Sequence, residues 1–189
     1  MKKKHFFTLV EILVATGIIA VLAGIGFAGY SFAMNSGRTN ATKTLIAQLT
    51  TALDTCQNKI GFYPASSGYG EIKFVLSTDG LPTEVYFNGT AFKKDSKGSQ
   101  KKFFNLFTKT LDLETIKMNC GTDGVLRDSW GNAILYRHDK DCINKGKYDI
   151  VSAGEDGGFG EDKATAPETA RTKYVDAEGN WLCDDVANF

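Results

Sequence analysis

The chain has 189 residues with equal numbers of acidic and basic side chains, 22 of each. This length provides one modest domain plus an appendage, and a net charge of zero argues neither for nor against a nucleic-acid partner. The two histidines lie far apart, and there is no nucleophile elbow, phosphate-binding loop or dinucleotide fingerprint, so we do not expect an enzyme.

The N-terminal region has the pattern of a membrane anchor. No charged residue occurs from Ile12 to Met34, and about 23 uncharged residues can cross a hydrocarbon core of ~30 Å as a helix. Lysines at positions 2, 3 and 4 are expected to stay in the cytoplasm, which places the following domain outside. A secretory signal peptide cut after Ala33 is an alternative, although its apolar core is usually shorter. An ordinary anchor explains the length but not Glu11.

A specific motif surrounds Glu11. Residues 7–14, F-T-L-V-E-I-L-V, closely resemble the prepilin signature of type IV pilins and type II secretion pseudopilins. The resemblance implies a prepilin leader of residues 1–6, cut between Phe6 and Phe7 by a membrane peptidase, and methylation of the new amine. It also implies that Glu11 compensates a neighbouring subunit's amine in the filament core and sets the axial register. Phe6 stands where the family usually has glycine.

One long helix is predicted from about residue 7 to residue 60. Residues 7–34 are the expected membrane-embedded half, and residues 35–60 the expected periplasmic half. In the second half, apolar side chains recur at spacings of three and four, which predicts one buried face. These side chains are Ile46, Leu49, Leu53 and Cys56. Gly61 and Pro64 are expected to end the helix.

Residues 61–189 are predicted to form a globular α+β domain, in which the long helix packs on a small antiparallel sheet with extended loops. Strands are expected at residues 72–76 and 84–87, turns at Asp79-Gly80 and Asn88-Gly89, and a helix at residues 100–111. A basic cluster precedes Phe103 and Phe104. We interpret it as a solvated loop, with stacking of these rings on nucleic acid as the less favoured alternative. The cluster comprises Lys93, Lys94, Lys97, Lys101 and Lys102.

Three later segments narrow the family resemblance. Residues 128–132, D-S-W-G-N, precede an expected strand at 133–137 and resemble the D-P-W-G-N motif of type II secretion major pseudopilins, with Ser129 in place of proline. Residues 148–158 resemble the strand and S-x-G-x-D-G loop of the same family, and residues 184–189 resemble its D-D-I-x-N-W ending. The segment 159–183 is longer than the resemblance leads us to expect.

The same resemblance implies a calcium site that joins the S-x-G-x-D-G loop to the C-terminal acidic pair. Calcium takes six to eight oxygen ligands from carboxylates and main-chain carbonyls. The implied ligands are the carboxylates of Asp156, Asp184 and Asp185 and the carbonyls of Ala153 and Gly158. Glu161 and Asp162 are alternatives to the C-terminal pair, and an acidic surface loop without an ion is a further alternative.

The four cysteines show no C-x-x-C spacing, and no histidine is spaced from them as a metal ligand, so a zinc site is not expected. An even number of cysteines in an exported domain suggests one or two disulfides, with buried thiols as the alternative. The cysteines are Cys56, Cys120, Cys142 and Cys183.

The expected function is structural. The lysines predict a single-pass protein with a cytoplasmic N-terminus, and the family resemblance implies the inner membrane and a periplasmic globular domain. Expected partners are identical or homologous pilin subunits, a prepilin peptidase, an inner-membrane assembly platform and membrane lipid, but not nucleic acid. Polymerisation into a type II secretion pseudopilus, which supports protein export across the outer membrane, is the favoured function. The alternatives are a type IV or competence pilus subunit for adhesion, motility or DNA uptake, and a secreted soluble binding domain.

Overall fold

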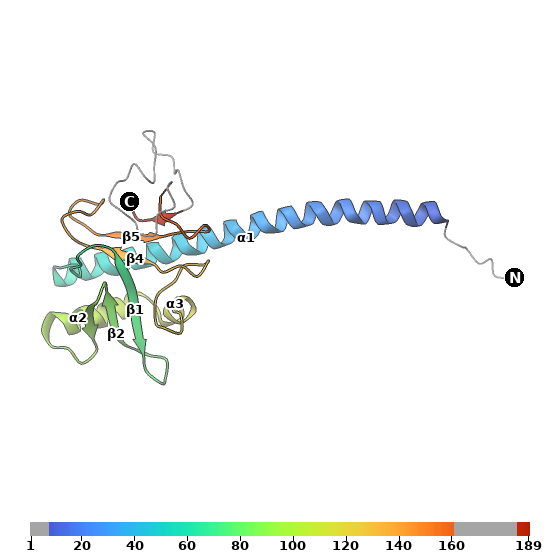
Figure 1. Cartoon of the computed structure of the whole chain (residues 1–189). Coiled ribbons are helices and arrows are strands. Elements are labelled where there is room, and N and C mark those ends of the chain that lie inside the picture. The colour runs from blue at the N-terminus through green and yellow to red at the C-terminus, as the bar shows by residue number, and fades with distance from the viewer. Residues whose placement is uncertain (1–7, 161–184) are drawn as a thin grey trace. The chain divides into compact units, whose positions relative to one another are not determined.

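The computed structural model of the chain describes residues 8–160 and 185–189. The chain divides into two compact units, Met1–Gly37 and Arg38–Phe189. A single helix, α1 (Leu9–Ile60), contributes to both units (Figure 1). It ends where the sequence predicts, because Gly61 takes a positive φ of 95° and its N–H donates to the carbonyl of Gln57. The predicted boundaries at residues 6 and 34 stay predictions.

The first unit contains the apolar half of α1, whose side chains are exposed. Leu9, Phe27 and Phe32 each keep more than three-quarters of their surface accessible. By length and composition, α1 is able to cross a membrane. A helix that exposes so much apolar surface is suited to contact with lipid or with other apolar helices.

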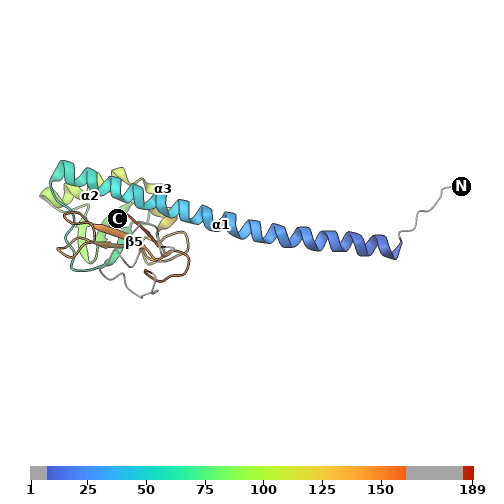
Figure 2. The ribbon, with the colours of Figure 1, turned by 90° about the horizontal axis from the view of Figure 1, so that it is seen from above.

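In the second unit, the C-terminal half of α1 packs on an antiparallel sheet, as predicted. The sheet has six strands in the order β3-β2-β1-β4-β5-β6. The strands are β1 (Gly70–Leu76), β2 (Pro82–Phe87), β3 (Thr90–Lys93), β4 (Leu135–Arg137), β5 (Asp149–Ser152) and β6 (Val186–Ala187). Two helices, α2 (Gly98–Thr110) and α3 (Leu113–Asn119), follow β3 in the chain. They lie on the same side of the sheet as α1 (Figures 1 and 2).

The register of the first hairpins follows from side-chain alternation along the strands. Ile72 lies opposite Phe87, and Phe74 lies opposite Val85, so all four side chains enter the core from one face. The predicted Asn88-Gly89 turn joins β2 to β3. Both residues have positive φ, 45° and 81°, as a tight two-residue hairpin turn requires.

The predicted apolar face of α1 lies at the centre of the core. Ile46, Leu49, Leu53 and Cys56 are all at most 3% exposed. An aromatic cluster adjoins them, in which Phe87 makes edge-to-face contacts with Phe103, Phe107 and Tyr136 at centroid distances of 5.8, 5.2 and 4.9 Å. Such pairs stabilise a fold by about 0.5–1.5 kcal/mol beyond the burial of their area.

The structure places the aromatic side chains of α2 and three of the four cysteines in the second unit. Phe103 and Phe104 are at most 3% exposed, so they belong to the core and are not placed to stack on nucleic acid. No disulfide joins the described cysteines, because Cys56, Cys120 and Cys142 are free thiols. They lie apart in the fold: the Cys56 Sγ is 4.0 Å from the Phe103 carbonyl, whereas the Cys142 Sγ donates to the Arg137 carbonyl. Cys183 lies outside the described residues.

Candidate functional site

The first turn of α1 contains a reciprocal pair formed by Thr8 and Glu11. The Thr8 N–H and hydroxyl donate to Glu11 Oε2 at 2.7 and 2.8 Å. In return, the Glu11 N–H donates to Thr8 Oγ1 at 3.3 Å. This arrangement is a capping box, which satisfies two backbone donors that a helix N-terminus otherwise leaves without partners.

The capping box gives Glu11 a defined orientation within its own subunit. Both accepted bonds use Oε2, while Oε1 makes no hydrogen bond among the residues that the structure describes. Oε2 therefore orients the carboxylate, and Oε1 is available to a donor from another molecule. The sequence contains the capping-box pattern T-x-x-E at Thr8 and Glu11. The prediction from sequence places Glu11 only in contact with a neighbouring subunit and misses its contact with Thr8. Phe6 and Phe7, the predicted processing residues, lie outside the described residues.

In the second unit, the structure brings two of the sequence motifs together. Asp128 opens the D-S-W-G-N loop, and its Oδ1 accepts the N–H groups of Trp130 and Asn132 at 2.9 and 2.8 Å. Its Oδ2 accepts the hydroxyl of Ser152, at the end of β5, at 2.7 Å. The Asn132 amide adds a bond to the Gly154 carbonyl at 2.7 Å. The carboxylate of Asp128 thus shapes one loop and binds it to the next.

The same loop is held against α1 through Thr42 and Ser129. The Ser129 N–H donates to Thr42 Oγ1 at 3.2 Å, and the Thr42 hydroxyl donates to Ser129 Oγ at the same distance. Thr42 is only 1% exposed. A proline at position 129 would remove the N–H and the hydroxyl together. Serine in place of proline therefore adds a direct connection between this loop and the long helix.

The acidic residues of the predicted calcium site are only partly described. The Asp156 Oδ1 accepts the Gly158 N–H at 2.9 Å, and the buried Asp185 accepts the Gly160 N–H through Oδ2 at 2.6 Å. Pairing of β6 with β5 brings the C-terminal segment beside the S-x-G-x-D-G loop. Asp184, Glu161 and Asp162 lie outside the described residues.

The described part of the predicted calcium site contributes two carboxylates, those of Asp156 and Asp185. Asp185 is 5% exposed, and a carboxylate so buried needs partners that compensate its charge. Within residues 8–160 and 185–189, no cluster of three or more histidine, cysteine, aspartate or glutamate side chains is placed to hold a metal. A complete ligand set therefore needs either main-chain carbonyls or carboxylates beyond the described ranges.

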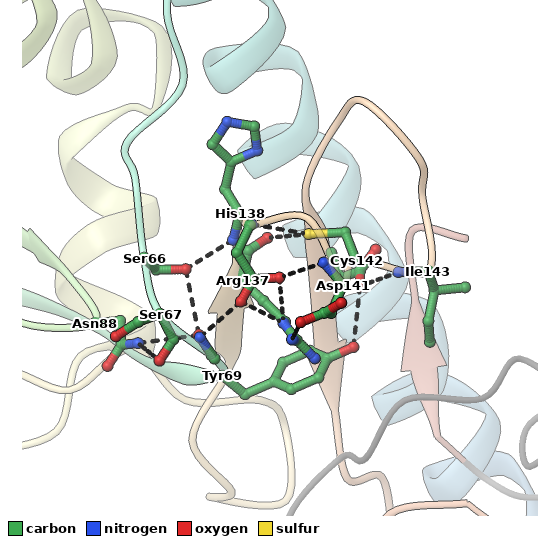
Figure 3. A network of polar contacts seen from close by, with 12 residues as sticks. Ser66, Ser67, Tyr69, Asn88, Arg137, His138, Asp141, Cys142 and Ile143 are labelled. Carbon is green, nitrogen blue, oxygen red and sulfur yellow. Dashed lines mark hydrogen bonds and ion pairs between the residues drawn. The ribbon is translucent and has the colours of Figure 1, made fainter.

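A polar network holds the loop that joins β4 to β5 (Figure 3). The Arg137 Nε lies 2.8 Å from Asp139 Oδ1, and the guanidinium lies 5.3 Å from the centre of the Tyr69 ring. The Tyr69 hydroxyl donates to Asp149, which also accepts two backbone N–H groups of the loop. Burial raises the pKa of the Cys142 thiol, so this cysteine is not a ready nucleophile. The network therefore stabilises the conformation of the loop between β4 and β5.

The comparison with protein families matches the N-terminal part of the chain. Residues 1–27 match the family model described as the prokaryotic N-terminal methylation motif. The chain therefore carries a type IV pilin-like prepilin signal, and the proteins that share this motif are structural subunits. The signal and the apolar helix together fit a membrane-anchored, pilin-like protein. No curated protein and no solved structure matches the chain.

Proposed function

We propose that the chain is a structural subunit of the type II secretion pseudopilus, a filament that supports protein export across the outer membrane. The observation that carries the proposal is the methylation motif at the start of a 52-residue helix, α1. One half of this helix exposes apolar side chains and the other half is the centre of a domain core. Such a subunit is stored in lipid and assembles when its apolar half exchanges lipid for the helices of other subunits.

Glu11 is the residue through which subunits recognise each other's N-termini in this proposal. Cleavage between Phe6 and Phe7 leaves a positive amine one residue before Thr8. A buried carboxylate and amine in a low-dielectric filament core attract each other strongly, and either one alone is unfavourable there. Because Thr8 orients Glu11 through Oε2, Oε1 is presented to the neighbour's amine.

The preference for a secretion pseudopilus over a surface pilus comes from the C-terminal motifs. The D-S-W-G-N loop and the loop after β5 both resemble segments of major pseudopilins, and Asp128 joins them through Ser152. Deletion of the gene tests this preference. We expect exported proteins to accumulate in the periplasm, with motility and DNA uptake unchanged. Loss of twitching motility or of DNA uptake, with normal secretion, would assign the chain to a surface pilus.

Processing is tested on the protein purified from its membrane. We expect the mature chain to begin at Phe7 with a methylated amine, as measured by intact mass and N-terminal sequencing. A mature chain that begins at Met34 would refute the pilin-like interpretation in favour of simple secretion. An uncut chain would contradict the processing step and would point to Phe6 as the cause.

Three variants separate the two roles of the Thr8–Glu11 pair. Glu11→Gln keeps an acceptor for the capping box but removes the charge. Thr8→Val keeps the charge but removes the two hydrogen bonds of the Thr8 hydroxyl, so only the backbone N–H of residue 8 still donates to Glu11. Glu11→Ala removes both the charge and the acceptor. If the carboxylate pairs with a neighbour's amine, both Glu11 variants lose filaments while Thr8→Val retains most of them. Processing of each variant is checked by mass first. Filaments from Glu11→Gln but not from Thr8→Val would show that helix capping, not charge, is what assembly requires.

We also propose a calcium ion held by Asp156, by the C-terminal acidic pair Asp184 and Asp185, and by the carbonyls of Ala153 and Gly158. An ion that binds only the folded state stabilises it by ~2.7 kcal/mol at a hundredfold excess over its Kd. The melting temperature should therefore rise with calcium and fall with chelator. Asp156→Ala should abolish this response, whereas Asp123→Ala, at an exposed acidic residue elsewhere, should leave it intact.

The pairs Asp184→Ala with Asp185→Ala, and Glu161→Ala with Asp162→Ala, decide which carboxylates complete the calcium site. The proposal requires the first pair to remove the calcium response and the second pair to preserve it. If instead only the second pair removes the calcium response, Glu161 and Asp162 are the ligands that complete the site. A melting temperature of the unmutated chain that does not change with calcium would leave an acidic loop without an ion.

A further inference from the structure

A hollow of about 380 Å³ lies on the surface of the second unit, where the end of α1 meets α2. We call it the lysine hollow, and it is lined by Lys59, Ile60, Lys102, Asn105, Leu106 and Lys109. Both views of the ribbon place the end of α1 beside α2 (Figures 1 and 2). The lysine hollow therefore combines three ammonium groups with two apolar side chains and one amide.

The positive charge of the lysine hollow is not compensated within the described part of the chain. Lys59, Lys102 and Lys109 are exposed, and none of them forms one of the four ion pairs found there. Helix α2 contains no acidic residue at all. Like charges gathered around an apolar floor repel one another, and an anionic surface that covers them relieves this repulsion.

The chemistry of the lysine hollow favours a protein partner over a nucleic acid. Surfaces that bind single-stranded nucleic acid combine positive charge with exposed aromatic rings on which bases stack. Here the aromatic residues of α2, Phe103, Phe104 and Phe107, are at most 3% exposed and face the core. The partly buried Leu106 and Ile60 offer instead an aliphatic contact of the kind found at the centre of protein interfaces.

The sequence of this chain contains an acidic region whose charge is complementary to that of the lysine hollow. Residues 93–110 contain six lysines and one aspartate, whereas residues 155–185 contain nine acidic and three basic residues. The chain as a whole is neutral, so each copy carries both the basic region and the acid it needs. A contact between two different surfaces of identical subunits is heterologous, and when the rotation does not close a ring it generates a helical filament.

We propose that the lysine hollow docks an acidic surface of a second copy of this chain in the assembled filament. The inference rests on the proposed function, since it names the surface through which the subunits join outside the apolar helices. Charged contacts of this kind select the correct neighbour and fix register more than they add affinity. The lysine hollow would then determine which subunits stack and how they are rotated.

The test uses filaments of the full chain assembled from a mixture of isotopically labelled and unlabelled copies. A carbodiimide joins an amine to a carboxylate only where the two are in contact, and mass spectrometry identifies joined peptides that combine both labels. We expect such links from Lys59, Lys102 or Lys109 to aspartate or glutamate of another copy. Links from these lysines only to a different protein, or no links at all, would overturn the proposal.

The matched variants reverse three charges each. Lys59→Glu, Lys102→Glu and Lys109→Glu together should lower the filament yield by about tenfold, which corresponds to roughly 1.4 kcal/mol. The control triple of Lys117→Glu, Lys140→Glu and Lys145→Glu changes the net charge equally at exposed lysines outside the lysine hollow and should assemble normally. Equal yields from both triples would refute the inference. A wild-type chain that forms no filaments would instead refute the proposed function itself.

Discussion

The hydrogen bond between Asp128 and Ser152 is expected to couple the two motif loops energetically. Both residues are buried, at 6% and 0% exposure, and the bond is 2.7 Å long. Hydrogen bonds to a charged acceptor contribute about 1.5–3 kcal/mol. Ser152→Ala should therefore destabilise the chain by about 2 kcal/mol. Asp128→Ala also removes the acceptor of the Trp130 and Asn132 N–H groups and should cost about 3–5 kcal/mol.

The double variant should be less unstable than the sum of the two single variants, by about 1.5–3 kcal/mol, because the shared bond is lost only once. The assay is equilibrium unfolding of the full chain in urea and detergent, followed by tryptophan fluorescence and extrapolated linearly to zero urea. Ser99→Ala, at an exposed serine on α2, serves as the control and should add to Asp128→Ala without coupling. A coupling below about 0.5 kcal/mol for Asp128 and Ser152 would show that the loops are held by other contacts.

Three further outcomes are expected. Phe87→Ala removes a fully buried ring that contacts four other aromatic residues, so it should lower the free energy of unfolding by about 3–5 kcal/mol in the same urea assay. Burial raises the pKa of Cys56 to about 12, so alkylation of this thiol at pH 8, measured by mass spectrometry, should be far slower in the native chain than in urea. Burial alone would raise the pKa of Asp139, but hydrogen bonds from Arg137, Gly68 and Asp141 hold it below its usual value. The ionised Asp139 carboxylate therefore stabilises the folded state above about pH 4, and this stabilisation is lost as the pH falls further. Asp139→Asn should weaken the dependence of the melting temperature on acid pH.

The parts of the fold that the sequence predicts well are those with a local signal. The period of Ile46, Leu49 and Leu53 identifies the buried face of α1, and Asn88-Gly89 identifies a hairpin turn because few other residues accept its backbone angles. The missed elements are short: β3 has four residues, α3 has seven and β6 has two. A two-residue strand has no period, and it exists only because β5 pairs with it.

The N-terminal motif was predictable from the sequence, whereas the contacts between the loops of the second unit were not. The methylation motif is continuous in sequence, so its position is apparent from the chain alone, whereas the role of Glu11 in subunit register stays a prediction. The bond between Asp128 and Ser152 joins residues 24 positions apart, and the bonds between Thr42 and Ser129 join residues 87 positions apart. No local pattern encodes such contacts, because they depend on how the loops pack after the sheet has formed. The lysine hollow is likewise not encoded by a local pattern, because it forms only when the end of α1 lies beside α2.

The location of the α1 stripe within the core also determines when the domain is able to fold during synthesis. The Tyr148 hydroxyl donates to the Thr50 carbonyl of α1 across 98 positions, and β1 pairs with β4 across more than 60. Contacts between residues so distant in sequence slow folding, because the loop between them must close first. The ribosome completes α1 long before β4 and β5, so its apolar stripe is not fully covered until about 90 further residues are made. Aggregation through this exposed stripe is therefore a hazard during synthesis that the finished domain does not share.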